Sequence, residues 1–172
     1  MEKERPIMKK FFAALTLVTL TFIFAGSAQA QEKPKLSLDK ASTSKLVSML
    51  EASGYNYAKA ADNVWTIKFK GNELPEFNVV IIGHEGMIIL LTVIAEKKDL
   101  KPSPEFYQKL LKFNDDFDRV KFGIDEDGDL FTRIDLSLRV VDLQELKLNL
   151  EQISAAVDEA YVGLKPYLNK KN

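Results

Sequence analysis

Three stretches of the chain carry apolar residues at the spacing of an α-helix. The first covers 42–53 and ends at Gly54, a residue type that readily adopts the left-handed conformation common after helices. The second begins at Ser103, which can cap a helix and is followed by proline. The third, 143–164, follows Asp142 in a sequence similar to a capping box. The sequence therefore predicts three helices.

Between these stretches the pattern is typical of strands. Residues 64–70 alternate between apolar and polar, whereas 77–82 and 87–95 are apolar at both odd and even positions. A second hairpin is expected around a turn at Asp125–Asp129. The predicted element order is α-βββ-α-ββ-α, which indicates an α+β fold whose antiparallel sheet is covered by helices on at least one face.

The two central strands carry a second apolar face that a single layer of helices leaves uncovered. Val80 and Ile82 on one strand, with Ile88, Leu90 and Ile94 on the next, are expected to form one contiguous patch there. Soluble monomers rarely expose large apolar patches. The sequence predicts a homodimer interface or a binding surface at these five residues, or else cover by helices and loops of the same chain on both faces.

The first 30 residues have the pattern of a secretory signal peptide, whether translation starts at Met1 or at Met8. Two lysines precede an apolar run, Phe11–Ala25, that is shorter than the ~20 residues a membrane-spanning helix needs. Ala28-Gln29-Ala30 has the small-x-small form read by signal peptidase. We expect cleavage after Ala30 and a periplasmic or secreted protein that is not held in the membrane.

The remaining chain is expected to contain a polar, flexible segment, 31–41, and a single domain, 42–170. Without the leader it keeps 20 basic and 23 acidic residues, a net charge of −3. This balance gives no basis for binding nucleic acid or an anionic membrane. The chain contains no cysteine, so an exported domain has to be stabilised by burial and not by disulfides.

No pattern in the sequence predicts a catalytic, metal or cofactor site. Asp125–Asp129 is acidic, but an EF-hand starting there would need Gly and Glu where Leu130 and Leu136 stand. We interpret it as a hairpin turn. His84, the only histidine, lies between two glycines in a tight connection with no cysteine anywhere in the chain, which favours a turn residue over a catalytic base or zinc ligand.

Three stretches of the sequence carry a family resemblance. Leu46–Phe69 predicts a helix that ends in Gly-Tyr before a strand with aromatic residues, Leu110–Asp129 a helix followed by a strand and an acidic turn, and Ile134–Ile153 a strand that leads into the last helix. In these stretches and in element order the chain resembles the type III secretion chaperone-like superfamily, specifically its YbjN-like branch, which is similar in fold to the CesT/Tir-type chaperones. The resemblance implies the same sandwich, commonly dimeric, and brings no catalytic residues.

The expected leader departs from this resemblance, because secretion chaperones act in the cytoplasm. We therefore expect an exported, non-enzymatic binding or chaperone-like module that forms a homodimer and has a protein partner. The alternative is a small-ligand-binding protein or an enzyme with a pocket between sheet and helices. A polar-lined cavity near His84 or Glu85 would favour this alternative, and a flat apolar patch would favour the binding module.

Overall fold

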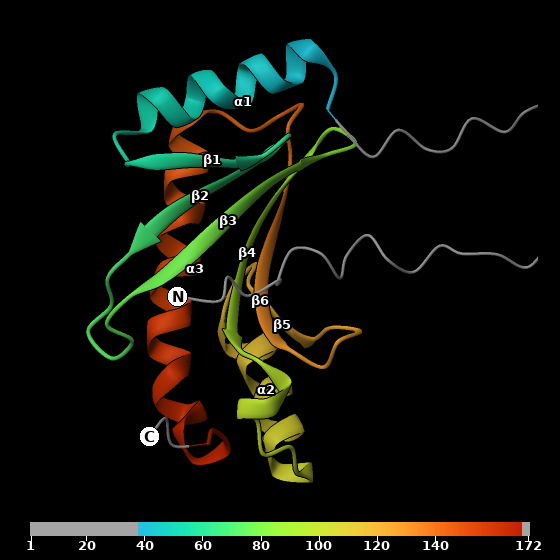
Figure 1. Ribbon diagram of the computed structural model, residues 1–172, viewed down its shortest axis with the longest axis vertical. Helices are drawn as coiled ribbons and strands as arrows, with labels where there is room; N and C mark the ends of the chain where they lie inside the picture. Colours follow the sequence, from blue (N-terminus) through green and yellow to red (C-terminus); the bar gives the residue numbers. More distant parts are fainter. Residues whose placement is uncertain (1–37, 170–172) are drawn as a thin grey trace, which may run out of the picture. The chain divides into compact units, whose positions relative to one another are not determined.

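The computed structural model describes residues 38–169. The predicted leader, 1–30, and most of the predicted polar segment, 31–41, lie outside the described residues. The described part contains a six-stranded sheet and three α-helices (Figure 1). Within it, no helix combines the length and the apolar character that crossing a membrane requires.

All neighbouring strands of the sheet pair antiparallel, in the order β1-β2-β3-β4-β6-β5. The strands are β1 Tyr57–Ala61, β2 Val64–Phe69, β3 Phe77–His84, β4 Met87–Ala95, β5 Lys121–Ile124 and β6 Leu130–Ser137. The chain leaves β4 through a helix and returns at the sheet edge as β5. As a result β6, and not β5, lies beside β4.

The sheet has one strand more than the sequence predicted. Tyr57–Ala61 forms β1, so the order is α-ββββ-α-ββ-α where α-βββ-α-ββ-α was expected. Its sequence, YAKAA, has little alternation, and alanine and lysine are depleted in strands. Pairing with β2 and not intrinsic preference therefore holds it in the sheet. The predicted fold class, α+β with helices packed on an antiparallel sheet, is confirmed.

Gly54, Ser103 and Asp142 cap helices as the sequence indicated, whereas the first helix starts at Lys40 behind an Asp39 cap, within the segment 31–41 that was predicted to be flexible. The helices are α1 Lys40–Ser53, α2 Pro104–Asp116 and α3 Leu143–Leu164, with short 3₁₀ turns η2 Lys97–Asp99 and η3 Lys165–Tyr167. Gly54 ends α1 with a φ of 83°. Ser103 Oγ accepts a hydrogen bond from the Phe106 N–H at 3.2 Å, and Asp142 Oδ1 accepts one from the Glu145 N–H at 2.8 Å. These side chains satisfy N–H groups that the first turn of a helix leaves unpaired.

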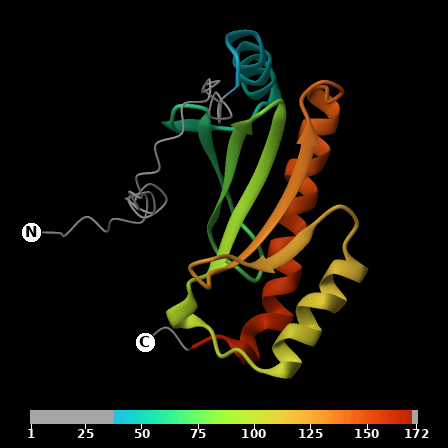
Figure 2. The ribbon, with the colours of Figure 1, turned by 90° about the vertical axis from the view of Figure 1, so that its right-hand side faces the viewer.

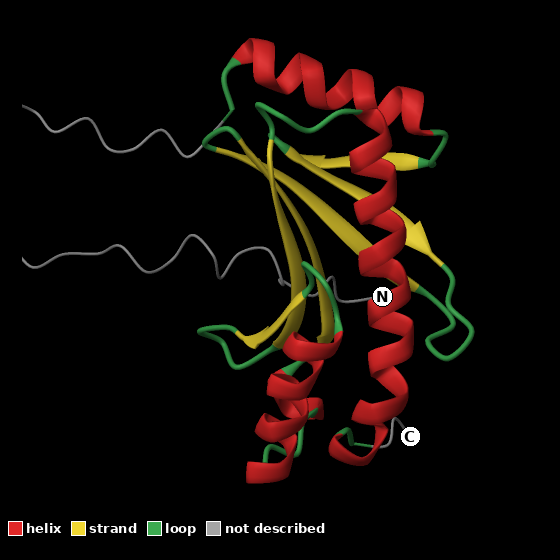
Figure 3. Ribbon diagram, turned by 180° about the vertical axis from the view of Figure 1, so that it is seen from behind, coloured by secondary structure: helices red, strands yellow, loops and turns green. Residues whose placement is uncertain are grey.

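All three helices pack on the same face of the sheet. Figure 2 shows α2 and α3 on one side of the strands, and Figure 3, seen from behind, shows α3 passing in front of them. On α2, the Phe113 ring centroid lies 5.2 Å from that of Phe122 on β5. A Cβ added to Gly83 of β3 would lie 2.4 Å from Cδ1 of Leu38, with Leu46 of α1 also beside it. Glycine at this position therefore lets the start of α1 approach the sheet.

The hydrophobic core lies between this helix-covered face and the helices. Every second residue of the central strands is buried in it: Phe77, Val79 and Ile81 on β3, Ile88 and Leu90 on β4, and Leu130, Ile134 and Leu136 on β6. The buried stripe of α3 includes Leu146, Leu150, Ile153, Val157, Ala160 and Leu164. The apolar spacing that predicted the last helix is thus explained by packing within the chain.

A side chain of α2 forms hydrogen bonds with the backbone at the outer edge of β5. Asn114 of α2 donates through Nδ2 to the Phe122 carbonyl at 3.1 Å, and its Oδ1 accepts from the Phe122 N–H at 2.7 Å. The amide thus occupies the place of a further strand. Pairing of this kind protects an edge strand from unwanted strand addition.

Candidate binding face

The face of the sheet opposite the helices carries a contiguous apolar surface, which we call the open face. None of the described helices covers it, and its residues alternate along each strand with those of the core. Its central side chains are Val64, Thr66, Val80, Ile82, Met87, Ile89, Leu91, Val93 and Phe131. Most are partly exposed, and Val93 is 47% exposed. Seen as in Figure 1, where α3 passes behind the strands, this face is turned toward the viewer.

The strand register arranges the open face in rows that cross the sheet. One row, which we call the Ile89 row, contains Val64, Ile82, Ile89 and Asp135. The next, the Leu91 row, contains Thr66, Val80, Leu91, Arg133 and Lys121. Each row is apolar over β3 and β4 and charged at β6. The surface therefore has an apolar centre and a charged flank.

Three charged side chains form this flank. Asp135 lies 2.7 Å from Nζ of Lys121 and 3.0 Å from Nη2 of Arg133. Partial burial acts to raise the pKa of Asp135, but the hydrogen bonds from Lys121 and Arg133, and then their charges, outweigh it and hold the pKa below its usual value. The flank therefore presents one carboxylate between two basic side chains.

The five residues predicted to share one patch lie on two faces. Val80 and Ile82 are on the open face, where they pair with Leu91 and Ile89. Ile88 and Leu90 point into the core and are both 0% exposed, so placing them on the uncovered face was wrong. Ile94 lies next to an irregularity in β4 and packs partly against the core. Whether Val80 and Ile82 bind a partner stays a prediction.

Sequence reasoning missed most of the open face. The omitted residues are the odd-numbered apolar positions of β4, together with Val64, Phe131, Arg133 and Asp135. The odd-numbered residues of β4 were recognised as apolar but assigned to the covered side. The charged flank gave no separate signal, because alternating charged residues on β6 are typical of any solvated strand face.

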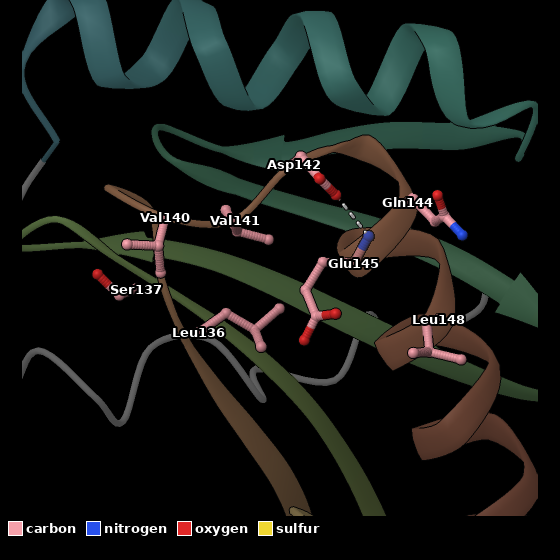
Figure 4. Close-up of a pocket in the computed structure, with 8 residues that line it drawn as sticks. All are labelled: Leu136, Ser137, Val140, Val141, Asp142, Gln144, Glu145 and Leu148. Carbon is pink, nitrogen blue, oxygen red and sulfur yellow. Dashed lines mark hydrogen bonds between the residues drawn. The ribbon is translucent and has the colours of Figure 1, made fainter.

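A hollow of about 370 Å³ lies where β6 passes into α3 (Figure 4). Its lining residues are Leu136, Ser137, Val140, Val141, Asp142, Gln144, Glu145 and Leu148. Asp142 caps the helix, as the dashed line in Figure 4 shows. Glu145 pairs with Arg119 and accepts a hydrogen bond from Nδ2 of Asn149 at 3.1 Å. Both acidic groups of the hollow are therefore held by contacts within the chain.

The other polar residues singled out in the sequence lie in turns. His84 Nε2 is 3.8 Å from Oε2 of Glu85, and neither residue lines the hollow. Asp125 Oδ1 accepts from the Asp129 N–H at 2.8 Å, and Asp129 Oδ1 accepts from the Lys97 N–H at 2.8 Å. The predicted hairpin turn is confirmed. Among residues 38–169, no group of three or more His, Cys, Asp or Glu side chains is placed to hold a metal ion.

Comparison with known proteins assigns the chain to a family. The family model YbjN, with the description "Putative bacterial sensory transduction regulator", matches residues 43–165. The chain belongs to the YbjN family. No curated protein matches its sequence.

Solved structures share the fold of this YbjN-family chain at low sequence identity. YbjN from E. coli, described as "a putative transcription regulator", is 17% identical with a TM-score of 0.52, over 78% of this chain and 99% of that one. A chain of the HopA1–SchA chaperone–effector complex is 11% identical with a TM-score of 0.51, over 70% of this chain and 94% of that one. The fold predicted from the resemblance is confirmed.

Proposed function

We propose that this YbjN-family chain is an exported, non-enzymatic module that binds another protein chain through the open face. The observation that carries the proposal is the continuous row of apolar side chains over β2, β3 and β4 on a face that none of the described helices covers. Large apolar patches on soluble proteins usually mark interaction sites.

The shape and chemistry of this face favour a protein over a small ligand. Small-ligand sites are concave and combine an apolar lining with a few converging polar groups. The open face is a strand surface, and the charged groups beside its apolar rows, Asp135, Lys121 and Arg133, already pair with one another at one flank. An apolar centre with a charged rim is typical of protein interfaces. The HopA1–SchA complex supports the proposal, since it shows this fold in a chaperone–effector assembly.

The alternative function is small-ligand binding or catalysis at the hollow beside α3. Its volume of about 370 Å³ is at the lower end of the range for ligand pockets. We favour the open face because Asp142 and Glu145 in the hollow are already engaged by the fold. Nucleic acid is a weaker candidate, since a net charge of −3 without the leader gives no overall attraction to phosphates.

Export is part of the proposal and has its own test. The leader pattern supports cleavage after Ala30, so the purified protein is expected to begin at Gln31 when its N-terminus is sequenced. The same chain with Ala28 and Ala30 both changed to bulky residues should stay uncleaved. Recovery of the wild-type chain with an intact leader in the membrane fraction would contradict export as a free protein.

Photo-crosslinking tests the binding face directly. A photoreactive phenylalanine analogue is placed at Leu91 on the open face or at Val162 of α3, which is 48% exposed and serves as the matched control. After irradiation of living cells, the Leu91 variant is expected to give discrete crosslinked protein bands several times stronger than those of the Val162 variant. Equal crosslinking at both positions, or none at Leu91, would reject the open face as a binding surface.

A further inference from the structure

We infer that the second half of β6, residues 134–137, is a docking edge for an extended segment of another protein. The segment pairs with the backbone of Asp135 and Ser137 and places an apolar side chain in the hollow beside α3. This edge is separate from the open face, so the inference goes beyond the proposed function. Two features carry it: unpaired backbone groups on β6, and the hollow next to them with carboxylates among its lining residues.

Only the first half of β6 has a strand on each side. β4 pairs along the length of β6, whereas β5 pairs only with 130–133. The chain before β5 does not continue along β6, because Arg119 has a φ of 63°, in the left-handed region, and its side chain pairs with Glu145 of α3. Within the described part of the chain, 134–137 therefore has no strand on the side away from β4.

The backbone groups on this side of β6 follow from the direction of those on β5. Successive residues of a strand direct their N–H and C=O groups to opposite sides. Phe122 directs both groups away from β6, to a side chain of α2, so its neighbours in β5 face the odd-numbered residues of β6. Asp135 and Ser137 continue this odd-numbered series beyond the end of β5.

Most of these groups have no partner. The Ser137 carbonyl accepts hydrogen bonds from the N–H groups of Val140 and Val141 at 3.1 and 3.0 Å. The N–H and C=O of Asp135 and the N–H of Ser137 have no such partner among the described residues. Donors and acceptors at this spacing are those that a further strand pairs with, as in peptide recognition by strand addition.

The hollow adjoins this edge and has apolar walls (Figure 4). Leu136 and Ser137 line it from β6, and Val140 and Leu148, which are 68% and 52% exposed, line it from the other side. Side chains at paired positions of neighbouring strands point to the same face of a sheet. The residue of a docked segment opposite Leu136 therefore points to the helix-covered face, where its side chain enters the hollow.

The charges of the hollow favour a segment that also carries a basic residue. The lining residues include two carboxylates, Asp142 and Glu145, and no cation. Glu145 pairs with Arg119 of the chain itself, so a guanidinium is accommodated here. Asp142 caps α3 through Oδ1, and its Oδ2 has no hydrogen-bond partner within residues 38–169. The segment is thus expected to carry an apolar and a basic side chain two positions apart, on the same side of the strand.

Other occupants and other edges fit these features less well. A small ligand in the hollow would leave the backbone groups of β6 unpaired. The outer edge of β5 is closed by Asn114. The outer edge of β1 has an irregularity between Lys59 and Ala61, and bulges and lysines discourage strand addition.

Selection from a random heptapeptide library displayed on phage tests the inference, with the purified protein as the target. The selected peptides are expected to carry an apolar residue with Lys or Arg two positions away. In NMR spectra, a bound peptide should shift the amide resonances of Asp135 and Ser137 more than that of Leu91 on the open face. Methylating the peptide nitrogens one at a time should find at least one whose methylation raises the dissociation constant about tenfold or more, because it removes a hydrogen bond to β6.

A matched pair of variants tests the hollow. Leu148→Arg places a long side chain at the hollow and should raise the dissociation constant about tenfold or more. Leu111→Arg changes a residue of α2 that is 70% exposed and does not line the hollow, and should leave the constant within about twofold of wild type. If Leu148→Arg does not fold, the methylated peptides test the pairing on the wild-type protein.

The other outcomes overturn the inference. These are no enriched peptide, binding that survives every methylation, or a folded Leu148→Arg that binds as wild type does. A dimer whose Asp135 and Ser137 amides are protected from exchange without peptide would place a second copy at the edge instead. Peptides that shift Leu91 and not Asp135 overturn the inference but leave the proposed binding face intact. Conversely, absence of photo-crosslinks at Leu91 rejects the proposed function and leaves peptide binding at β6 unaffected.

Discussion

Replacing Leu90 by lysine is expected to abolish folding, whereas the same change at the next residue, Leu91, should leave a cooperative unfolding transition. Leu90 is 0% exposed and points into the core, so a lysine in its place would put a charge there and leave the cavity of a leucine. Together these effects cost about 5 kcal/mol or more, comparable to the whole stability of many domains. Leu91 is partly exposed on the open face, where a surface substitution costs about 0.5 kcal/mol.

The measurement is urea unfolding followed by the fluorescence of Trp65, the single tryptophan, which is 3% exposed in the core. Each variant is examined at low protein concentration, so that assembly contributes little to stability. Both variants replace leucine by lysine, and they differ only in the face of the sheet on which the lysine lies. If Leu90→Lys folds as well as Leu91→Lys, the assignment of Leu90 to the core is wrong.

Leu90 and Leu91 also show how far the sequence indicates which face of the sheet a residue lies on. The connection between β3 and β4 is Glu85-Gly86, and the two residues have φ values of 46° and 76°. These positive values are typical of a type I′ hairpin turn. A connection with an even number of residues pairs even-numbered positions of one strand with odd-numbered positions of the next, as Ile82 with Ile89. The correct grouping was therefore available from the length of the turn.

Hydrophobicity alone could not show which face the helices cover. Ile88 and Leu90 on one side of β4 are no more apolar than Ile89 and Leu91 on the other. What distinguishes the faces is contact with α1, α2 and α3, which depends on residues far away in the sequence. The start of α1 reaches β3 beside Gly83, and no local pattern marks that glycine as a packing position.

The starts of α2 and α3 were predictable because capping is local. Ser103 and Asp142 each satisfy an N–H three residues later, so the signal lies within four residues of sequence. The pairing of Asn114 with Phe122 was not predictable, since it joins a helix to an edge strand whose position is set by the sheet. The charged flank was missed for the same reason, because Lys121 and Asp135 come together only through the register of β5 with β6.

The loop between β2 and β3 is expected to lose its anchor when Asp158 is replaced. On α3, the Asp158 carboxylate accepts hydrogen bonds from the backbone N–H groups of Asn72, Glu73 and Leu74 at 2.9, 2.8 and 2.8 Å. A Cβ on Gly71 would lie 2.1 Å from Oδ1 of Asp158, so glycine is needed for this close approach. Asp158→Ala leaves three donors without their acceptor and should cost about 2 kcal/mol.

Gly71→Ala is expected to be destabilising by a similar amount, because its methyl group displaces the same carboxylate. The two changes should not add, since each removes one shared set of contacts. Urea unfolding of both single variants and the double variant measures this coupling. A double variant whose loss equals the sum of the two single losses would show that Gly71 and Asp158 act independently.

The anchor should also depend on pH in a defined direction. The hydrogen bond from the Leu74 N–H is the largest cause that lowers the pKa of Asp158 below its usual value of 3.8. Burial opposes it, and the hydrogen bonds from Asn72 and Glu73 lower the pKa further. A carboxyl group whose pKa is lower in the folded state stabilises the fold above its unfolded pKa and loses this contribution as pH falls through the folded value. The difference in unfolding free energy between wild type and Asp158→Asn should therefore be constant from neutral pH to about pH 5 and shrink toward about pH 2.

Subtracting the unfolding free energy of Asp158→Asn from that of wild type isolates the contribution of Asp158, because the other carboxylates are present in both proteins. The measurement is urea unfolding of wild type and Asp158→Asn at a series of pH values. A difference that grew on acidification would mean that folding favours the protonated form of Asp158, and that the carboxylate does not hold the loop as an anion.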